Sequence, residues 1–376
     1  MRPLITFILV ILFAVAVAAQ SDPKPSPTPK SDEPEQRVRV FTEEVRLPVV
    51  ATDAGGHYDA ALEANEVLVL EDGKPQQIRS IQHLPTNVLL LLDLGNALGL
   101  KDTNLTRALA TRVIGSLHPD DRIAIMQFAT HAELLQRWTT DRAALAKVLA
   151  PKGKLIAGKN SRLTDAIVAA SAQFKDTPAG TRHIVLITDG VEAPGGRISI
   201  NEAVKQLNSV QVTVHVISYT ALARTTLQTN NKVIRGGDGV QRDGNPASNP
   251  VANGDPTLPP GATRTPVFKI GSIDTDVPMR RKKKEYERAT KEAEQKLTEI
   301  AEDSGGRIII SETPENLLAQ ADSITRDIGA QYVITYRPTR PLSAAKPGEY
   351  RRVEVASRRA GLYLRSRKGY VVPAQE

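Results

Sequence analysis

The sequence predicts an α/β protein with a doubly wound, mostly parallel sheet that is inserted in, or flanked by, a small β-sandwich. Continuous apolar strands alternate with amphipathic helices in the middle of the chain, a pattern typical of a parallel sheet covered by helices on both faces. Short strands with alternating apolar residues occupy both ends of the folded part. The 376 residues, of which 40% are hydrophobic, are enough for more than one core.

The α/β pattern extends over residues 86–330. The stretch "NVLLLLDL" from Asn87 is apolar almost throughout, which suits a strand buried on both faces. Apolar residues at helical spacing predict helices over Asp102–Leu117, Asp141–Ala150 and Pro314–Gly329, the last begun by proline in its first turn. We therefore expect a central α/β domain with these boundaries.

Strand-like segments without helices precede and follow this domain, over residues 37–85 and 331–373. The tetrapeptide Glu71–Lys74, "EDGK", lies between two apolar runs and predicts a β-hairpin. The second region begins with another strand, "QYVITYRPT", from Gln331. We expect the two ends of the chain to pair into one sandwich, with the α/β domain inserted between them.

The N-terminal residues predict an export signal followed by a tether. Residues 1–19 contain a basic residue, then an apolar run, then small residues, which is the pattern of a cleaved signal peptide. An uncleaved anchor helix is the alternative, since about 20 apolar residues span a bilayer. Residues 20–36 are rich in proline and polar residues and predict a disordered tether. We expect an exported protein, periplasmic or secreted.

Residues 222–284 interrupt the α/β pattern with glycine, proline and asparagine, and they predict a disordered insert. A binding loop that a partner orders is the alternative. The insert ends in the basic run Arg280–Lys284, and the whole chain has a formal charge of +7. Such a run is most often a solvated linker followed by a charged helix face. If it binds a partner in an exported protein, anionic envelope polymers or lipid head groups are expected rather than nucleic acid.

The chain lacks the residues that several kinds of catalysis need. It has no cysteine, which excludes disulfides, thiol catalysis and thiolate metal sites. It has neither a nucleophile elbow nor a phosphate-binding loop that ends in Gly-Lys-Ser/Thr. His183 and His215 lie at or inside apolar strands, where we expect hydrogen-bonded core histidines. The sequence therefore predicts neither an enzyme nor a nucleotide-binding protein.

A series of short motifs occurs in a fixed order along the chain. The motifs are "LEDGKPQQI", "VLLLLDLGNA", "SRLTDAI", "HIVLITDG", "AEDSGGRI" and the closing pair "QYVITYRP" and "RKGYVV". In this order the chain resembles a von Willebrand factor A domain. Nearly everything after the tether is similar to exported bacterial proteins of the von Willebrand factor A-related type, of the kind found in acidobacteria. The resemblance implies a protein-interaction module of the adhesion type.

The resemblance also implies a metal site. In the family, an Asp and two Ser of one loop, a Thr of a second and an Asp of a third hold a divalent cation that recruits a partner's carboxylate. Residue by residue, these positions fall on Asp93, Gly95 and Ala97, Ser161, and Asp189. The implied site is degenerate, because glycine and alanine replace the two serines. Its remaining ligands would hold Mg²⁺ or Mn²⁺ weakly.

The place of these residues in the fold supports a binding role. In doubly wound sheets, ligands bind beyond the carboxyl ends of the strands, which is where Asp93 and Asp189 are expected. Asn96 lies between the two lost serines, and we expect it to contact a partner together with both aspartates.

Structural roles for the same residues remain open. Lys159 or Arg162 could neutralise the aspartates in place of a metal ion. Ser161 could cap the helix that follows it. The two aspartates could accept backbone N–H bonds in tight loops.

Two functions follow from the sequence. The first is an exported adhesion-type module that binds another protein at the degenerate metal site. The alternative is a metal-independent scaffold protein of the cell envelope, which contacts anionic polymer through its basic segments.

Overall fold

The computed structural model describes residues 43–95, 102–175, 177–193, 195–234, 277–346 and 348–372. The expected signal peptide and the expected tether, residues 1–19 and 20–36, lie outside the described residues. No helix within the described ranges is both long and apolar enough to cross a membrane.

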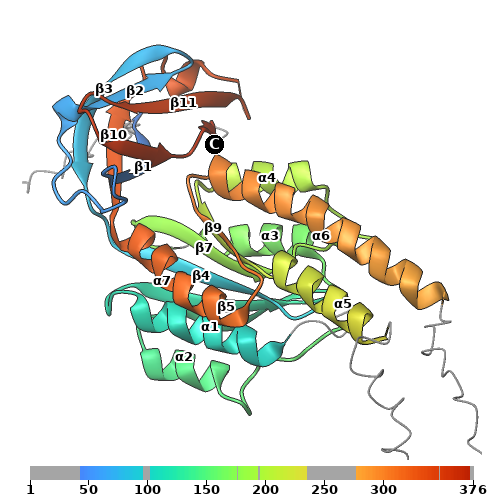
Figure 1. The fold of residues 1–376 in the computed structure, drawn as a ribbon. Coiled ribbons are helices and arrows are strands. Elements are labelled where there is room, and N and C mark those ends of the chain that lie inside the picture. Colours follow the sequence, from blue (N-terminus) through green and yellow to red (C-terminus); the bar gives the residue numbers. More distant parts are fainter. Residues whose placement is uncertain are drawn as a thin grey trace, which may run out of the picture. The chain divides into compact units, whose positions relative to one another are not determined.

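The middle of the chain forms a six-stranded sheet in the order β6-β5-β4-β7-β8-β9 (Figure 1). Its strands are β4 (Thr86–Asp93), β5 (Arg122–Phe128), β6 (Ala132–Thr139), β7 (Thr181–Thr188), β8 (Thr213–Ser218) and β9 (Ile308–Ile310). All neighbouring strands are parallel except β5 and β6. Every residue of β4 is buried, as its apolar run predicts. The predicted mostly parallel sheet is confirmed.

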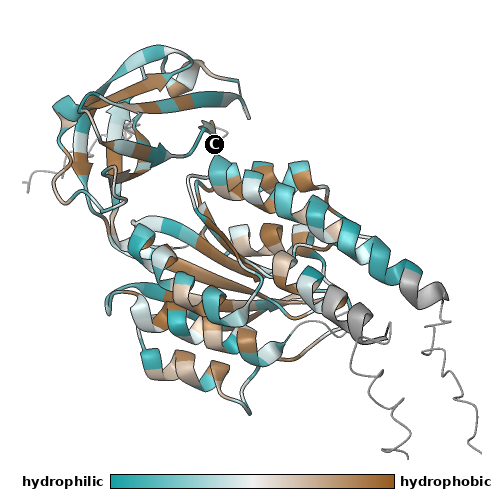
Figure 2. Ribbon diagram, in the orientation of Figure 1, coloured by the Kyte–Doolittle hydropathy of each residue, from teal (hydrophilic) through white to brown (hydrophobic). Residues whose placement is uncertain are grey.

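Helices cover both faces of this sheet. They are α1 (Thr103–Ser116), α2 (Arg142–Leu149), α3 (Leu163–Ala172), α4 (Ile200–Ser209), α5 (Thr220–Ile234), α6 (Val277–Asp303) and α7 (Pro314–Gly329). Leu109 of α1 and Leu317 of α7 belong to the core on one face. Ile167 of α3, Leu207 of α4 and Leu297 of α6 belong to the core on the other. In Figure 2 the strands between these layers are mostly hydrophobic.

Capping residues set several helix boundaries. Asp102 accepts a hydrogen bond from the Asn104 amide at the start of α1, and Asp141 does the same for Ala143 at the start of α2, both at 2.8 Å. Helix α7 begins with proline, as predicted. The three helices therefore lie within a residue of their predicted ends.

The insert predicted over residues 222–284 is narrower in the structure. Helix α5 extends to Ile234, and α6 already begins at Val277, so both ends of the predicted insert are helical. The basic run at Arg280 is accordingly part of a helix. Residues 277–284 of α6 are largely basic, so their apolar spacing predicted no helix. Residues 235–276 lie outside the described residues.

The two ends of the folded chain form an antiparallel sheet of seven strands in the order β12-β1-β10-β3-β2-β11-β13. The strands are β1 (Val45–Thr52), β2 (Val67–Glu71), β3 (Lys74–Gln82), β10 (Gln331–Arg337), β11 (Tyr350–Ser357), β12 (Tyr363–Ser366) and β13 (Gly369–Val371). Short 3-10 helices lie at Ala64–Glu66 and Leu342–Ala344. Strand β10 pairs with both β1 and β3, and β2 pairs with β11. The expected pairing of the two regions is confirmed, although they form one curled sheet (Figure 1).

The predicted hairpin joins β2 to β3. Asp72 and Gly73 have φ values of 49° and 77°, the left-handed conformations that a two-residue hairpin turn requires. Glu71, the residue before this turn, is buried in the antiparallel sheet and pairs with the buried Arg351 of β11 at 2.9 Å. The hydroxyls of Tyr336 and Tyr370 donate to the same carboxylate. These donors satisfy a charge that would otherwise be costly to bury.

A buried carboxylate links the antiparallel sheet to the α/β domain. Asp327 of α7 is fully buried and accepts hydrogen bonds from Arg307 Nε at 2.7 Å and from the Tyr58 hydroxyl at 2.5 Å. It also pairs with Arg365 of β12. Burial acts to raise the pKa of Asp327, but these three partners outweigh it and lower the pKa from 3.8 to about 2.

We predict that Asp327→Asn lowers the free energy of unfolding at neutral pH by about 2–3 kcal/mol, because Arg307 and Arg365 lose their counter-charge. The pKa of Asp327 in the folded state lies below its ordinary value. The ionised Asp327 therefore contributes fully to the stability of the native protein above about pH 5, and this contribution is lost as the pH falls toward 2. Urea unfolding at several pH values measures both effects, and the variant should lose less stability than the native protein on acidification.

Asp322→Asn is the matched control. Asp322 lies on the same helix and pairs with Arg112 at 2.5 Å, but the Arg112 side chain is 54% exposed. An exposed pair of this kind contributes about 1 kcal/mol or less. If Asp327→Asn and Asp322→Asn lowered the free energy of unfolding equally, the buried ion pairs of Asp327 would be no more stabilising than an exposed pair.

Candidate functional site

Two of the three predicted ligands lie at the carboxyl-end edge of the parallel sheet because their strands are neighbours. Asp93 is the last residue of β4, and Asp189 follows the last residue of β7. The two strands pair in parallel, with Leu92 opposite Ile187, so both aspartates lie at the same edge. The sequence prediction of their position is confirmed.

Ser161 comes to the same edge through the loop before α3. The Gly158 amide donates to the Leu94 carbonyl at 2.8 Å, which fixes this loop against the end of β4. The Ser161 hydroxyl then donates to Asp93 Oδ1 at 2.5 Å. Because α3 begins after Arg162 without a side-chain cap, Ser161 does not cap the helix. Asn96 and Ala97, the remaining positions of the first loop, lie outside the described residues.

Asp93 is the centre of a hydrogen-bonded network. Its Oδ1 accepts from the Gly95 amide at 3.1 Å as well as from Ser161, and its Oδ2 accepts from the Thr188 hydroxyl at 2.6 Å. The Thr188 hydroxyl oxygen accepts in turn from the Gly190 amide at 2.8 Å. Asp93 therefore ties together the loops that follow β4 and β7 and the loop that precedes α3.

Asp189 has a second set of donors. Its Oδ1 accepts from the Val191 amide at 3.1 Å, within the loop. Its Oδ2 accepts from the hydroxyl of Tyr286 on α6. Burial, and next the nearby charge of Asp189, raise the pKa of Tyr286, so the tyrosine remains a neutral donor at physiological pH. Asp189 thus connects the edge of the sheet to α6.

Neither aspartate presents its carboxylate at the surface. Asp93 is 0% exposed, Asp189 is 2% exposed, and Ser161 is 6% exposed. Direct contact of Asp93 or Asp189 with a partner, as the sequence suggested, would require their surroundings to move. In this arrangement the two buried carboxylates accept hydrogen bonds that hold the surrounding loops at this edge of the sheet.

The position of the first missing serine has no room for a side chain. A Cβ on Gly95 would lie 2.2 Å from Ser161 Oγ and 2.5 Å from the Asn160 backbone. The backbone of Gly95 forms a parallel bridge to Gly158, which explains this close approach. The glycine at this position is therefore part of how the loops pack.

The donor set fits a hydrogen-bonded site better than a cation site. Mg²⁺ needs about six oxygen ligands in near-octahedral geometry. Here all four carboxylate oxygens of Asp93 and Asp189 accept hydrogen bonds from the protein, and a cation would compete with Tyr286 for Asp189. The described ranges contain no group of three or more His, Asp or Glu side chains suited to a metal ion.

No strong sequence signal points to two of the residues in this network. Thr188 precedes Asp189 at the end of β7, and only the pairing of β7 with β4 brings it to Asp93. Tyr286 is 97 residues from Asp189 in the chain and lies just beyond the insert predicted over residues 222–284. Arg162, one of the cations considered for neutralising the aspartates, pairs with Asp165 at 4.0 Å.

The histidines that sequence reasoning assigned to the core are indeed buried. His183 and His215 are fully buried in β7 and β8, and their Nδ1 and Nε2 atoms lie 3.3 Å apart. The amide of Arg307 donates to His215 Nδ1, which leaves its Nε2 as the donor to His183. Burial lowers the pKa of His215 to about 3, so this pair is neutral at physiological pH.

Comparison with known proteins identifies the domain that carries this site. The family model of the von Willebrand factor type A domain matches residues 87–234. The chain contains a von Willebrand factor type A domain. Strand β9 and helices α6 and α7 follow the matched range, yet β9 pairs with β8 and completes the sheet of this A domain.

Solved structures of other proteins are similar to the chain at low identity. An aerotolerance-related membrane protein from Bacteroides fragilis, with multiple mutations to serines, has 18% identity and a TM-score of 0.38, and the match covers 65% of this chain and 98% of that one. The conserved hypothetical protein BatB from Bacteroides thetaiotaomicron has 17% identity and a TM-score of 0.37, with coverage of 64% and 98%. A von Willebrand factor type A protein from Catenulispora acidiphila has 12% identity and a TM-score of 0.41, with coverage of 88% and 74%. No curated protein matches the chain.

We predict that Gly95→Ser, which restores a serine of the family pattern, lowers the free energy of unfolding by about 1–3 kcal/mol, because the new Cβ overlaps Ser161 and Asn160. Gly115→Ser is the matched control, since a Cβ on Gly115 of α1 meets no atom within 4 Å. Denaturant unfolding measures both, and a Gly95→Ser variant as stable as the control would contradict the close packing of this loop.

Proposed function

We propose that the chain is a protein-interaction module that binds a partner protein at the carboxyl-end edge of its A domain, without enzymatic activity and without a bound metal ion. Domains of this type commonly mediate protein–protein interactions. The signal-like sequence of residues 1–19 supports action outside the cytoplasm. The partner would meet the loops that Asp93 and Asp189 hold in place, rather than the two carboxylates themselves.

The observation that carries this proposal is an exposed isoleucine on the loop that Asp93 fixes. Ile156 is 69% exposed and precedes Ser161 in the loop before α3. Its amide donates to the Gln127 side chain at 3.1 Å, and the Gly158 amide donates to Leu94. The backbone on both sides of Ile156 is therefore held by the end of the sheet. An exposed apolar side chain on a fixed backbone is a suitable anchor for a protein partner, because the backbone loses little entropy on binding.

Anionic envelope polymer is a less well supported partner. The basic residues of α6 do not all present free charge, because Arg281 pairs with Glu285 and Arg288 pairs with Glu292, each at 3.0 Å. These pairs lower the net positive charge of the helix surface. Binding that weakens steeply with rising salt would favour the polymer over the protein partner.

We predict that millimolar Mg²⁺ or Mn²⁺ leaves the melting temperature of the protein unchanged. A cation at 100 times its dissociation constant would stabilise the folded state by about 2.7 kcal/mol and would raise the melting temperature. Differential scanning fluorimetry with each cation and with EDTA measures this. A cation-dependent rise that Asp189→Asn abolishes would instead establish Asp93, Ser161 and Asp189 as a working metal site.

We predict that Tyr286→Phe destabilises the protein by about 1–3 kcal/mol, because it removes a hydrogen-bond donor from a buried carboxylate. Tyr363→Phe is the matched control, since Tyr363 is 61% exposed, and we expect its effect to be near zero. Thermal and urea unfolding compare the two variants. An unaffected Tyr286→Phe variant would show that the Asp189 carboxylate does not depend on this donor.

The proposed function is tested by capturing partners from a cell-envelope extract of the source organism in the presence of EDTA. We expect a protein partner that the native chain retains and that Ile156→Ser loses. Tyr363→Ser is the control, because it removes a similarly exposed apolar side chain from the antiparallel sheet. Capture that requires a divalent cation, or that Ile156→Ser leaves intact, would refute the proposal.

A further inference from the structure

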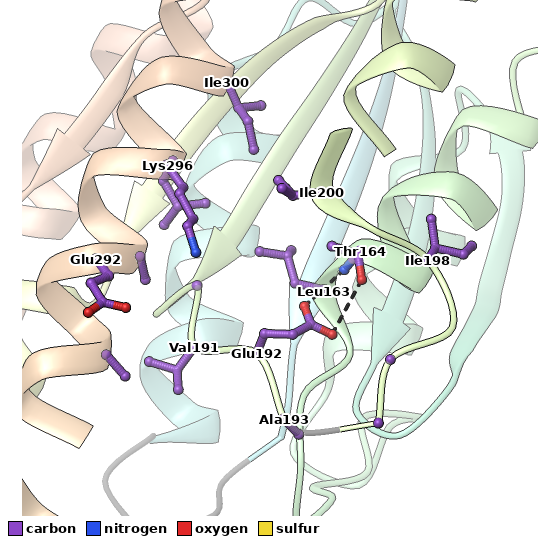
Figure 3. Close-up of a pocket in the computed structure, with 16 residues that line it drawn as sticks. Leu163, Thr164, Val191, Glu192, Ala193, Ile198, Ile200, Glu292, Lys296 and Ile300 are labelled. Atoms are coloured by element: carbon purple, nitrogen blue, oxygen red, sulfur yellow. Dashed lines mark hydrogen bonds between the residues drawn. The ribbon is translucent and has the colours of Figure 1, made fainter. Parts of the chain in front are cut away.

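A groove of about 490 Å³ lies beside the edge just described, between α6 and the loop from β7 to α4 (Figure 3). The loop contributes Gly190, Val191 and Glu192, which directly follow Asp189. The start of α3 contributes Leu163 and Thr164. The volume lies within the range of about 300–1,000 Å³ that is usual for ligand-binding pockets.

The floor of the groove is apolar. Leu163 of α3 and Leu297 and Ile300 of α6 are buried there and belong to the core on this face of the sheet. Ile198 and Ile200 are partly buried and line the opposite side (Figure 3). An aliphatic side chain placed on this floor would extend the core and remove further apolar surface from water.

Small residues keep the groove open. Gly190 has a φ of 67°, and a Cβ at this position would lie 2.7 Å from Leu297 Cδ1. Ala289 and Ala293 line the face of α6 that borders the groove. The loop and the helix approach each other closely here, and larger side chains would fill the space between them.

Opposite charges border the apolar floor. Glu192 accepts hydrogen bonds from the amide of Thr164 at 3.1 Å and from its hydroxyl at 3.4 Å, so its carboxylate is fixed at the start of α3. Lys296 extends from α6 toward the loop (Figure 3). Glu292, a third charged residue at the rim, pairs with Arg288 at 3.0 Å.

The environment of Glu192 favours a cation. Partial burial raises the pKa of its carboxyl group, and the charge of Asp165 adds to this, against the lowering effect of the hydrogen bonds from Leu163 and Thr164. A positive group placed beside Glu192 would stabilise the ionised carboxylate. Lys296 offers the complementary site for a negative group across the floor.

We propose that this groove binds a short segment of a partner protein in which an aliphatic residue lies between a basic and an acidic residue. The aliphatic side chain packs on Leu163, Leu297 and Ile300, the basic residue pairs with Glu192, and the acidic residue pairs with Lys296. This inference rests on the proposed function, since it names the kind of segment that a partner at this edge would contribute.

The test uses the full chain with labelled isoleucine and leucine methyl groups and three capped peptides. The first peptide contains Lys-Leu-Asp, the second Ser-Leu-Ser and the third Lys-Ser-Asp. We expect the Lys-Leu-Asp peptide to shift the methyl resonances of Ile198, Ile200 and Ile300 in a saturable way. The other two should bind at least about fivefold more weakly, since each lacks one of the two kinds of contact.

Charge reversals test the pairing directly. Lys296→Glu and Glu192→Lys should each weaken the Lys-Leu-Asp peptide about threefold to fivefold. A Lys-Leu-Lys peptide should bind Lys296→Glu more tightly than it binds the native chain. Lys291→Glu is the matched control, because Lys291 is an exposed residue of α6 that does not line the groove, and it should leave the affinity within about twofold.

Three results would overturn the inference. The groove methyl groups could fail to respond to Lys-Leu-Asp, the Ser-Leu-Ser peptide could bind equally well, or the groove signals could shift with protein concentration alone, which would assign the groove to a second copy of the chain. The outcomes separate this inference from the proposed function. Peptide binding without capture of a partner refutes only the proposed function, and capture without peptide binding refutes only the groove.

Discussion

The charge of Asp93 has to be satisfied inside the protein, and much of the local architecture follows from this requirement. A fully buried carboxylate is tolerated when hydrogen bonds replace its contacts with water. Gly95, Ser161 and Thr188 supply those bonds. Gly95 follows β4, Ser161 lies in the loop before α3, and Thr188 ends β7, so one buried carboxyl group holds together three segments that are far apart in the sequence. The loop that contains Ile156 and the groove beside Glu192 lie next to these three segments.

The sequence was informative wherever local patterns determine the structure. The apolar run of β4 predicted a strand buried on both faces, Asp72 and Gly73 predicted a hairpin, and the proline of α7 predicted where that helix begins. The positions of Asp93 and Asp189 followed from their place at the ends of parallel strands. In each case the structure is determined by interactions between residues close in sequence, or by the burial of a whole strand, and both leave a local pattern in the sequence.

The parts that sequence did not predict depend on contacts between distant segments. That Tyr286 reaches Asp189 depends on how α6 packs beside the loop after β7, 97 residues away in the chain, and no local pattern shows this. The lack of room at Gly95 depends on the path of the loop around Gly158. A comparison with the family pattern shows that glycine stands at position 95, but only the packing of the loops shows that no side chain fits there.

The pairing of β10 has a consequence for how the chain is synthesised. Strand β10 lies between β1 and β3, with Val45 opposite Tyr336, so the antiparallel sheet joins segments made early and late in translation. The A domain lies between these segments in the chain, so its internal contacts can form before β10 has been synthesised. Strand β1 therefore has no partner strand until β10 has been synthesised, whereas β2 and β3 can pair with each other early. Closing so long a loop is slow, and the folded A domain shortens the distance that the two ends have to search.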